Sequence, residues 1–169
     1  MRRIDDLGRV VIPKEIRRTL RIREGDALEI FTDNQGGVIF KKYSPVGELS
    51  TFAAQMAEVL QGTAGRPVVI CDRDHMIAVS GVSKREYLER RVSAELEEAM
   101  QNRQSEAGDA VLHPVEGVDC AACAICPILA QGDVAGAVLL LQRDGGPAGE
   151  TELRLARVAA GFLGKQLEA

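Results

Sequence analysis

The chain has 169 residues, of which 46% are hydrophobic, 27% charged and 4% aromatic, with a formal net charge of −4. This composition is typical of a folded globular protein and excludes a disordered chain. Acidic residues at positions 5 and 6 rule out a secretory signal directly after Met1. The longest apolar stretch, residues 135–141, is too short to span a bilayer. We therefore expect a cytoplasmic protein without a membrane partner.

The charges are unevenly distributed. Residues 1–43 carry ten basic and seven acidic side chains, which give +3, whereas residues 44–169 carry 11 basic and 18 acidic side chains, which give −7. A basic head on an acidic body is typical of a nucleic-acid-binding module joined to a second module, although the asymmetry is weak evidence on its own.

The first 43 residues predict a small strand and helix unit. Residues 10–12 form a short apolar run that predicts a strand, and Pro13 suits the first turn of a helix. Residues 27–32 and 38–43 predict two strands, joined by a hairpin turn at residues 33–37. A unit this small buries little surface and contains no cysteine pair, so we expect it to be an obligate dimer.

Residues 44–47 (Ser-Pro-Val-Gly) predict a linker between a domain at 1–43 and a domain at 48–169. The second domain opens with a helix at 49–60, followed by a hairpin of strands at 67–71 and 76–79. Ser83 and Glu86 predict a capping box that opens a helical region to about residue 104. Residues 110–115, 124–130 and 135–141 predict further strands, and a helix begins at about 149.

The last predicted helix is apolar on two faces. One face is spaced like a bundle seam and consists of Leu153, Ala156, Ala160, Leu163 and Leu167. The other consists of Leu155, Val158, Ala159 and Phe162. A helix with two apolar faces is normally covered on both, so we expect a neighbouring helix from either the same chain or a partner chain.

A cationic stripe marks the predicted helix of the head. Lys14, Arg17, Arg18 and Arg21 fall at i, i+3, i+4 and i+7, and arginines at 2, 3 and 9 flank them. Guanidinium groups bind phosphates and guanine edges in a bidentate manner. For an isolated stripe, a solvated surface paired with Asp5, Asp6 and Glu15 would be the better interpretation.

The segment 2–20, RRIDDLGRVVIPKEIRRTL, resembles the N-terminal domain of the AbrB transition-state regulators, as do residues 25–30 and 41–43. Residues 69–74, 77–81, 132–138 and 159–163 also resemble the SpoVT-type members of this group, which continue into a GAF domain. The resemblance implies an α+β chain, with a dimeric swapped-hairpin β-barrel in front of an antiparallel sheet flanked by helices.

The resemblance also implies a DNA interface. The family's DNA-contacting arginines match Arg2, Arg9, Arg17 and Arg18, and Arg3 and Lys14 are plausible additions. Double-stranded DNA that is pliable and A/T-rich is the implied partner. Members of the family usually carry several residues before the match to Arg2, so either the true start lies upstream or the first strand is short.

Cysteines form the sharpest pattern of the second domain, Cys120-Ala-Ala-Cys123-Ala-Ile-Cys126-Pro127. Such spacing lets thiolates converge on a metal or cluster, with Cys71 or His113 as a fourth ligand. A redox disulfide and inert small side chains are the alternatives, and we favour inert side chains because Cys126 falls at the start of a predicted strand. The sequence identifies no cofactor.

Our leading hypothesis is a transcription regulator of the sporulation programme, modulated by an unknown small-molecule effector at the GAF-like domain. We expect a homodimer at minimum, or a homotetramer. One alternative is an antitoxin that represses its own operon, although the patterned C-terminal helix is unlike the usual disordered tail. A second alternative is a cysteine-dependent GAF enzyme that reduces free methionine sulfoxide, but no catalytic triad or phosphate loop is present, so we predict no enzyme activity.

Overall fold

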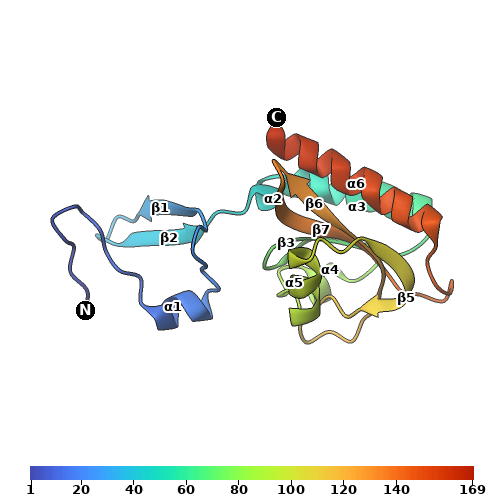
Figure 1. Cartoon of the computed structure of the whole chain (residues 1–169), viewed down its shortest axis with the longest axis horizontal. Helices are drawn as coiled ribbons and strands as arrows, with labels where there is room; N and C mark the ends of the chain where they lie inside the picture. Colours follow the sequence, from blue (N-terminus) through green and yellow to red (C-terminus); the bar gives the residue numbers. More distant parts are fainter. The chain divides into compact units, whose positions relative to one another are not determined.

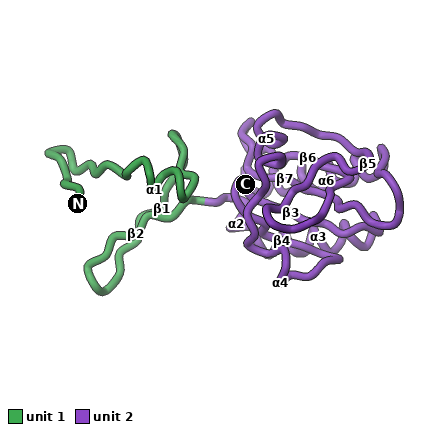
Figure 2. Tube along the Cα trace, turned by 90° about the horizontal axis from the view of Figure 1, so that it is seen from below, with its two compact units in different colours: residues 1–43 green, residues 44–169 purple.

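The computed structural model describes all residues, 1–169, and the chain divides into two compact units. The first consists of Met1–Tyr43 and the second of Ser44–Ala169 (Figure 2). None of the helices combines the length and apolarity needed to cross a membrane.

The first unit contains helix α1 (Lys14–Thr19) and a hairpin of strands β1 (Leu28–Thr32) and β2 (Val38–Lys42). The strands pair antiparallel, with Ile30 opposite Phe40. In the turn, Asp33 accepts hydrogen bonds from the amides of Gln35 and Gly37. The two predicted strands and their turn are confirmed.

The strand predicted at residues 10–12 is wrong for the single chain, because this segment has no regular secondary structure. A strand requires a neighbour for its backbone groups, and nothing in the unit pairs with it. Val10 and Val11 are exposed, with 41% and 68% of their surface accessible.

The first unit has no buried residue. Its large apolar side chains are instead exposed, and they include Ile4, Leu7, Val11, Ile30, Phe31, Val38, Ile39 and Phe40. Exposed apolar surface of this kind normally marks an interaction site.

The second unit is built on a five-stranded antiparallel sheet of order β4-β3-β7-β6-β5. Its strands are β3 (Val68–Asp72), β4 (Met76–Ser80), β5 (Glu106–Leu112), β6 (Ala122–Ala130) and β7 (Asp133–Leu141). The central strands β3 and β7 are buried along most of their length, because helices cover both faces of the sheet. The strands predicted at 67–71, 76–79, 124–130 and 135–141 and the hairpin turn at 72–75 are confirmed. The strand predicted at 110–115 is misplaced, since β5 begins at Glu106 and ends at Leu112.

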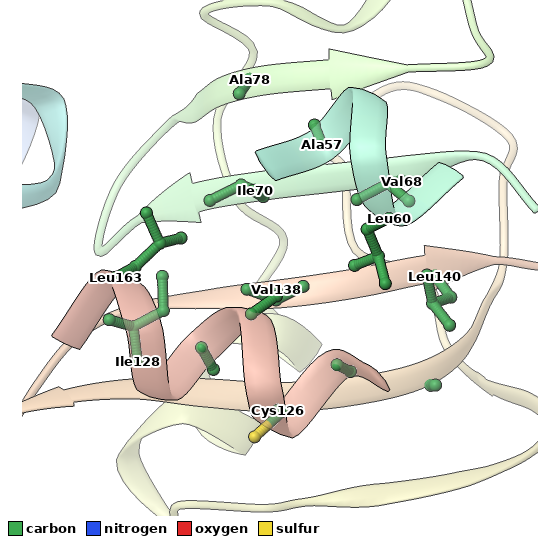
Figure 3. Close-up of a cluster of buried hydrophobic side chains, with 14 of the residues drawn as sticks. Ala57, Leu60, Val68, Ile70, Ala78, Cys126, Ile128, Val138, Leu140 and Leu163 are labelled. Carbon is green, nitrogen blue, oxygen red and sulfur yellow. The ribbon is translucent and has the colours of Figure 1, made fainter. Parts of the chain in front are cut away.

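Helices α3 (Ser50–Ala64) and α6 (Glu150–Glu168) pack on one face of the sheet (Figure 1). The core beneath them includes Leu60, Ile70, Val138 and Leu163 (Figure 3). A Cβ at Gly164 would lie 2.3 Å from the carbonyl oxygen of Leu129, so this glycine lets α6 approach β6 closely.

Two short helices, α4 (Lys84–Tyr87) and α5 (Ala94–Gln101), belong to the opposite face. A second core lies there and includes Met76, Tyr87, Val92 and Leu96.

The single helical region predicted for residues 83–104 is therefore wrong. The chain leaves the helix at Leu88, and Glu89 adopts a left-handed backbone conformation with φ of 63°. Between the two helices the backbone forms hydrogen bonds with the β3–β4 hairpin. The amide of Met76 donates to the carbonyl of Arg90, and the amide of Val92 donates to the carbonyl of Asp74. Ser83 makes no capping hydrogen bond, whereas Ser93 accepts one from the amide of Leu96 and begins α5.

The helical turn α2 (Pro45–Glu48) includes three of the four residues expected to form the linker at 44–47. Its residue Val46 is fully buried in the core of the second unit. Ser44 caps this turn by accepting a hydrogen bond from the amide of Gly47, and its hydroxyl donates to the carboxylate of Asp72 at 2.7 Å. The entrance to the second unit is thus fixed to the β3–β4 turn.

Candidate nucleic-acid interface

All six basic side chains predicted to contact DNA are exposed. Arg2 and Arg3 lie in the N-terminal segment, Arg9 lies in the loop that follows, and Lys14, Arg17 and Arg18 lie on α1. Every one of them belongs to the first unit, residues 1–43 (Figure 2).

The loop of residues 5–9 is closed by its own hydrogen bonds. One carboxylate oxygen of Asp5 accepts from the amides of Leu7 and Arg9, at 3.0 and 2.8 Å. The other accepts from Nε of Arg9 at 2.8 Å. The backbone bonds Asp5 N to Arg9 O and Gly8 N to Asp5 O complete the closure. Hydrogen bonds from the backbone and side chain of Arg9 hold the pKa of Asp5 below its ordinary value, so its carboxylate is ionised at neutral pH.

Helix α1 is only six residues long and carries Lys14, Arg17 and Arg18. Arg17 donates from Nε to the carbonyl of Ile12, which draws its side chain back toward the segment that enters the helix. The helix ends with the amide of Ile22 bonded to the carbonyl of Arg17 and that of Arg21 to the carbonyl of Arg18. This is the Schellman pattern.

The cationic stripe on α1 is therefore shorter than predicted, because it includes Lys14, Arg17 and Arg18 but not Arg21. Arg21 stands outside α1, in a left-handed conformation with φ of 53°, at the position where glycine is the usual residue. Because arginine occupies this position, the sequence has no glycine there that would predict the end of the helix.

A small polar cluster ties the segment after α1 to the hairpin. Nζ of Lys42 donates to the carbonyl of Arg21 and lies 3.4 Å from the carboxylate of Asp26. That carboxylate also accepts from the amide of Arg23. The end of β2 is thereby linked to the end of the helix that carries the arginines.

The three clustered cysteines do not converge. Cys123 and Cys126 lie in the core under α3 and α6, whereas Cys120 and Cys71 belong to the core on the other face of the sheet. A bulge in β6 between Ala122 and Ala124 explains why Cys123 and Cys126 share a face despite their odd spacing. No group of three or more His, Cys, Asp or Glu side chains is arranged to hold a metal ion.

All four cysteines are free thiols. Burial raises the pKa of Cys71, Cys120, Cys123 and Cys126. His113, considered as a fourth ligand, is largely exposed, and its Nδ1 lies 3.7 Å from the carboxylate of Glu95. The geometry fits small buried side chains better than a metal site.

Sequence reasoning missed two contributors to this surface. Asp5 was considered only as a partner that would neutralise the stripe, whereas it closes the loop that carries Arg9. The Asp-x-x-Gly-Arg spacing could have indicated this, because aspartate commonly accepts hydrogen bonds from amides two residues on. The bond from Arg17 to Ile12 leaves no signal in the sequence.

Solved structures resemble the second unit. The GAF domain of an Acinetobacter phosphoenolpyruvate-protein phosphotransferase superposes with a TM-score of 0.60 and 12% identity, over 73% of this chain and 87% of that one. A type II free methionine-R-sulfoxide reductase from Thermoplasma acidophilum gives a TM-score of 0.54 and 11% identity, over 72% and 94%. At such identities only the fold is shared, and the second unit is GAF-like.

The head matches shorter proteins. Residues 1–47 match the model for "Antidote-toxin recognition MazE, bacterial antitoxin". The transition state regulatory protein AbrB of Bacillus subtilis is 60% identical over 45 residues, which are 27% of this chain and 46% of that protein. The molecule thus combines an AbrB-type head with a GAF-like domain.

Two findings cover the second unit and the whole chain. Residues 48–168 match the model for "Stage V sporulation protein T C-terminal, transcription factor". Stage V sporulation protein T of Bacillus subtilis is 52% identical, over 99% of this chain and 96% of that protein. The chain belongs to the stage V sporulation protein T family and is a transcription regulator with a GAF-like C-terminal domain.

Proposed function

We propose that the protein binds double-stranded DNA through Arg2, Arg3, Arg9, Lys14, Arg17 and Arg18 and regulates genes of the sporulation programme. The observation that carries the proposal is the exposure of all six side chains on a head with a net charge of +3, in a chain otherwise acidic. Guanidinium groups fit duplex phosphates and guanine edges. The link to sporulation rests on the 52% identity to stage V sporulation protein T of Bacillus subtilis.

A salt series tests the DNA contacts. Arg17→Ala and Arg18→Ala should each weaken binding and reduce the slope of log affinity against log salt by about 1 for each chain in the complex, because each removes one phosphate contact per chain. Gel shifts of promoter fragments from the organism's own genome measure this, with Lys165→Ala on the second unit as the control. An unchanged slope in both arginine variants would refute the assignment.

We infer that the head is a dimer in which hairpins of two chains interleave. A head with no buried residue and with exposed Ile30, Phe31 and Ile39 lacks a core of its own. A partner chain would cover these side chains and pair with the unpaired segment 10–12. The measurement is the mass of the full chain in solution, and a monomer at micromolar concentration would contradict the inference.

We propose that residues 1–43 are the DNA-binding domain and residues 48–169 a sensor domain that takes a small-molecule effector, and that the protein acts in the cytoplasm. Support comes from the division of the chain after Tyr43 and from the GAF-like fold. The antitoxin alternative is supported only by the match of residues 1–47 to the MazE antitoxin model. The 19-residue helix α6 and the folded second unit do not resemble a disordered antitoxin tail.

We infer that the second unit is not an enzyme, although its fold resembles that of a methionine sulfoxide reductase. A reductase needs reactive thiolates, whereas burial raises the pKa of every thiol in this chain. We expect no turnover of free methionine sulfoxide with thioredoxin or dithiothreitol as the reductant. Turnover that is lost in Cys120→Ser or Cys123→Ser would overturn this inference.

A further inference from the structure

Arg9 differs from the other five basic residues of the interface because its guanidinium already has an acidic partner in the chain. Nε of Arg9 lies 2.8 Å from the carboxylate of Asp5, and the two side chains are 71% and 38% exposed. Ion pairs this exposed contribute little to stability. Folding stability therefore does not explain the role of this ion pair.

The geometry leaves the outer face of the guanidinium open. An arginine has five N–H donors in one plane, and Asp5 engages the one on Nε. The four N–H groups on the two terminal nitrogens form the fork that binds phosphate or the edge of guanine. Asp5 thus holds the guanidinium at its inner edge and leaves the recognition edge unoccupied.

The backbone that carries Arg9 is fixed by the same carboxylate. Its second oxygen accepts from the amides of Leu7 and Arg9, and Gly8 takes a left-handed conformation with φ of 78° to close the turn. Both ends of Arg9, the amide and the guanidinium, are therefore attached to one carboxylate. An unrestrained arginine loses rotamer freedom when it is immobilised on binding, and pre-ordering reduces this entropic cost.

We propose that Asp5 is a positioning residue for DNA recognition. It orients Arg9 toward the edge of one base, so that an acidic side chain increases the discrimination between DNA sequences. This inference rests on the proposed DNA-binding function. It makes a prediction opposite to simple electrostatics, since removing an acid beside DNA should strengthen binding to any sequence.

Asp5→Asn is the sharpest test, because the amide keeps one oxygen to accept from the backbone and loses the one that accepts from Arg9. The probe is a duplex that the wild-type chain selects from a random pool, and a duplex of alternating inosine and cytosine measures non-specific binding. We expect Asp5→Asn to lose about tenfold in affinity for the selected duplex. Non-specific binding should stay unchanged or rise by no more than about threefold.

Asp6→Asn is the matched control. It removes the same charge one residue away, and Asp6 makes none of the hydrogen bonds that close the loop. It should raise binding to both duplexes alike. Gly8→Ala supplies a second route to the same effect: it disturbs the left-handed turn without changing any charge, and it should also lower the preference for the selected duplex.

A double-mutant cycle separates positioning from other roles. In an Arg9→Ala background, Asp5→Asn should cause no further loss of sequence preference, because the group that Asp5 orients is gone. If Asp5→Asn behaves like Asp6→Asn, or if its loss persists in the Arg9→Ala background, the inference is overturned. If the wild-type chain selects no duplex at all, the proposed DNA-binding function has failed instead.

Discussion

Arg66 is the one charged or polar side chain that is buried in the structure, with 7% of its surface exposed. Its guanidinium donates to the carbonyls of Gly145, Gly146 and Pro147, in the loop between β7 and α6. Nε also lies 3.7 Å from Glu152, whose carboxylate accepts from the amide of Gly149 at the start of α6. One side chain therefore fixes how the last helix begins.

Replacing Arg66 with methionine should destabilise the second unit by about 3 kcal/mol, because three carbonyls and Glu152 lose their common donor. Arg154→Met is the control, since its ion pair with Glu150 is exposed and should contribute less than about 0.5 kcal/mol. Urea unfolding followed by circular dichroism measures both. Equal stability of the two variants would show that the loop between β7 and α6 does not depend on Arg66.

The thiols make a second prediction at the residue scale. Cys71, Cys123 and Cys126 are buried, whereas Cys120 is partly exposed. In the native protein a thiol reagent should modify Cys120 alone, and in urea it should modify all four cysteines. Mass spectrometry after timed alkylation counts the modified residues. Rapid modification of Cys123 in the native state would contradict the structure.

At the scale of the element, Ser93 performs the role that the sequence pattern assigned to Ser83. Its hydroxyl accepts from the amide of Leu96 at 3.0 Å and donates to the carbonyl of His113 at 2.5 Å. Ser93→Ala should therefore cost about 1 kcal/mol of stability, whereas Ser83→Ala should be near neutral. Thermal unfolding of the two variants compares them directly, and a larger loss for Ser83→Ala would reverse the assignment of the cap.

The same region shows what a single sequence could predict. Strands such as 67–71 and 135–141 were found because their apolar runs depend only on local pattern. The break after Tyr87 was missed because its cause is tertiary: the backbone at Arg90 and Val92 bonds to Met76 and Asp74. The early end of α1 was missed because Arg21 occupies a glycine position. The arginines of the head were predicted through their resemblance to a family, whereas the hydrogen bonds that Asp5 accepts from Arg9 were first seen in the structure.

For the whole molecule, the last helix poses the question of self-association. The face of α6 predicted to form a seam is confirmed as the buried one, since Leu153, Ala156, Ala160 and Leu163 lie in or against the core. On the second face Ala159 is buried, but Val158 and Phe162 remain 71% and 41% exposed. The neighbouring helix α3 also exposes Phe52 and Val59. Helix α3 therefore covers only part of the second face.

We expect a second copy of the chain to cover the remainder, so that two head dimers join through their second units into a tetramer. Phe162→Glu and Val158→Glu would each place a charge in that contact, which is costly in a desolvated interface. Each should halve the mass measured by sedimentation while the head dimer persists, because the hairpin lies in a separate unit. Arg157→Glu, an exposed site that lies about 100° around the helix from Val158, should leave the mass unchanged. If the Phe162 and Val158 variants keep the wild-type mass, the exposed face of α6 does not join two copies, and the hairpins alone would have to account for the assembly.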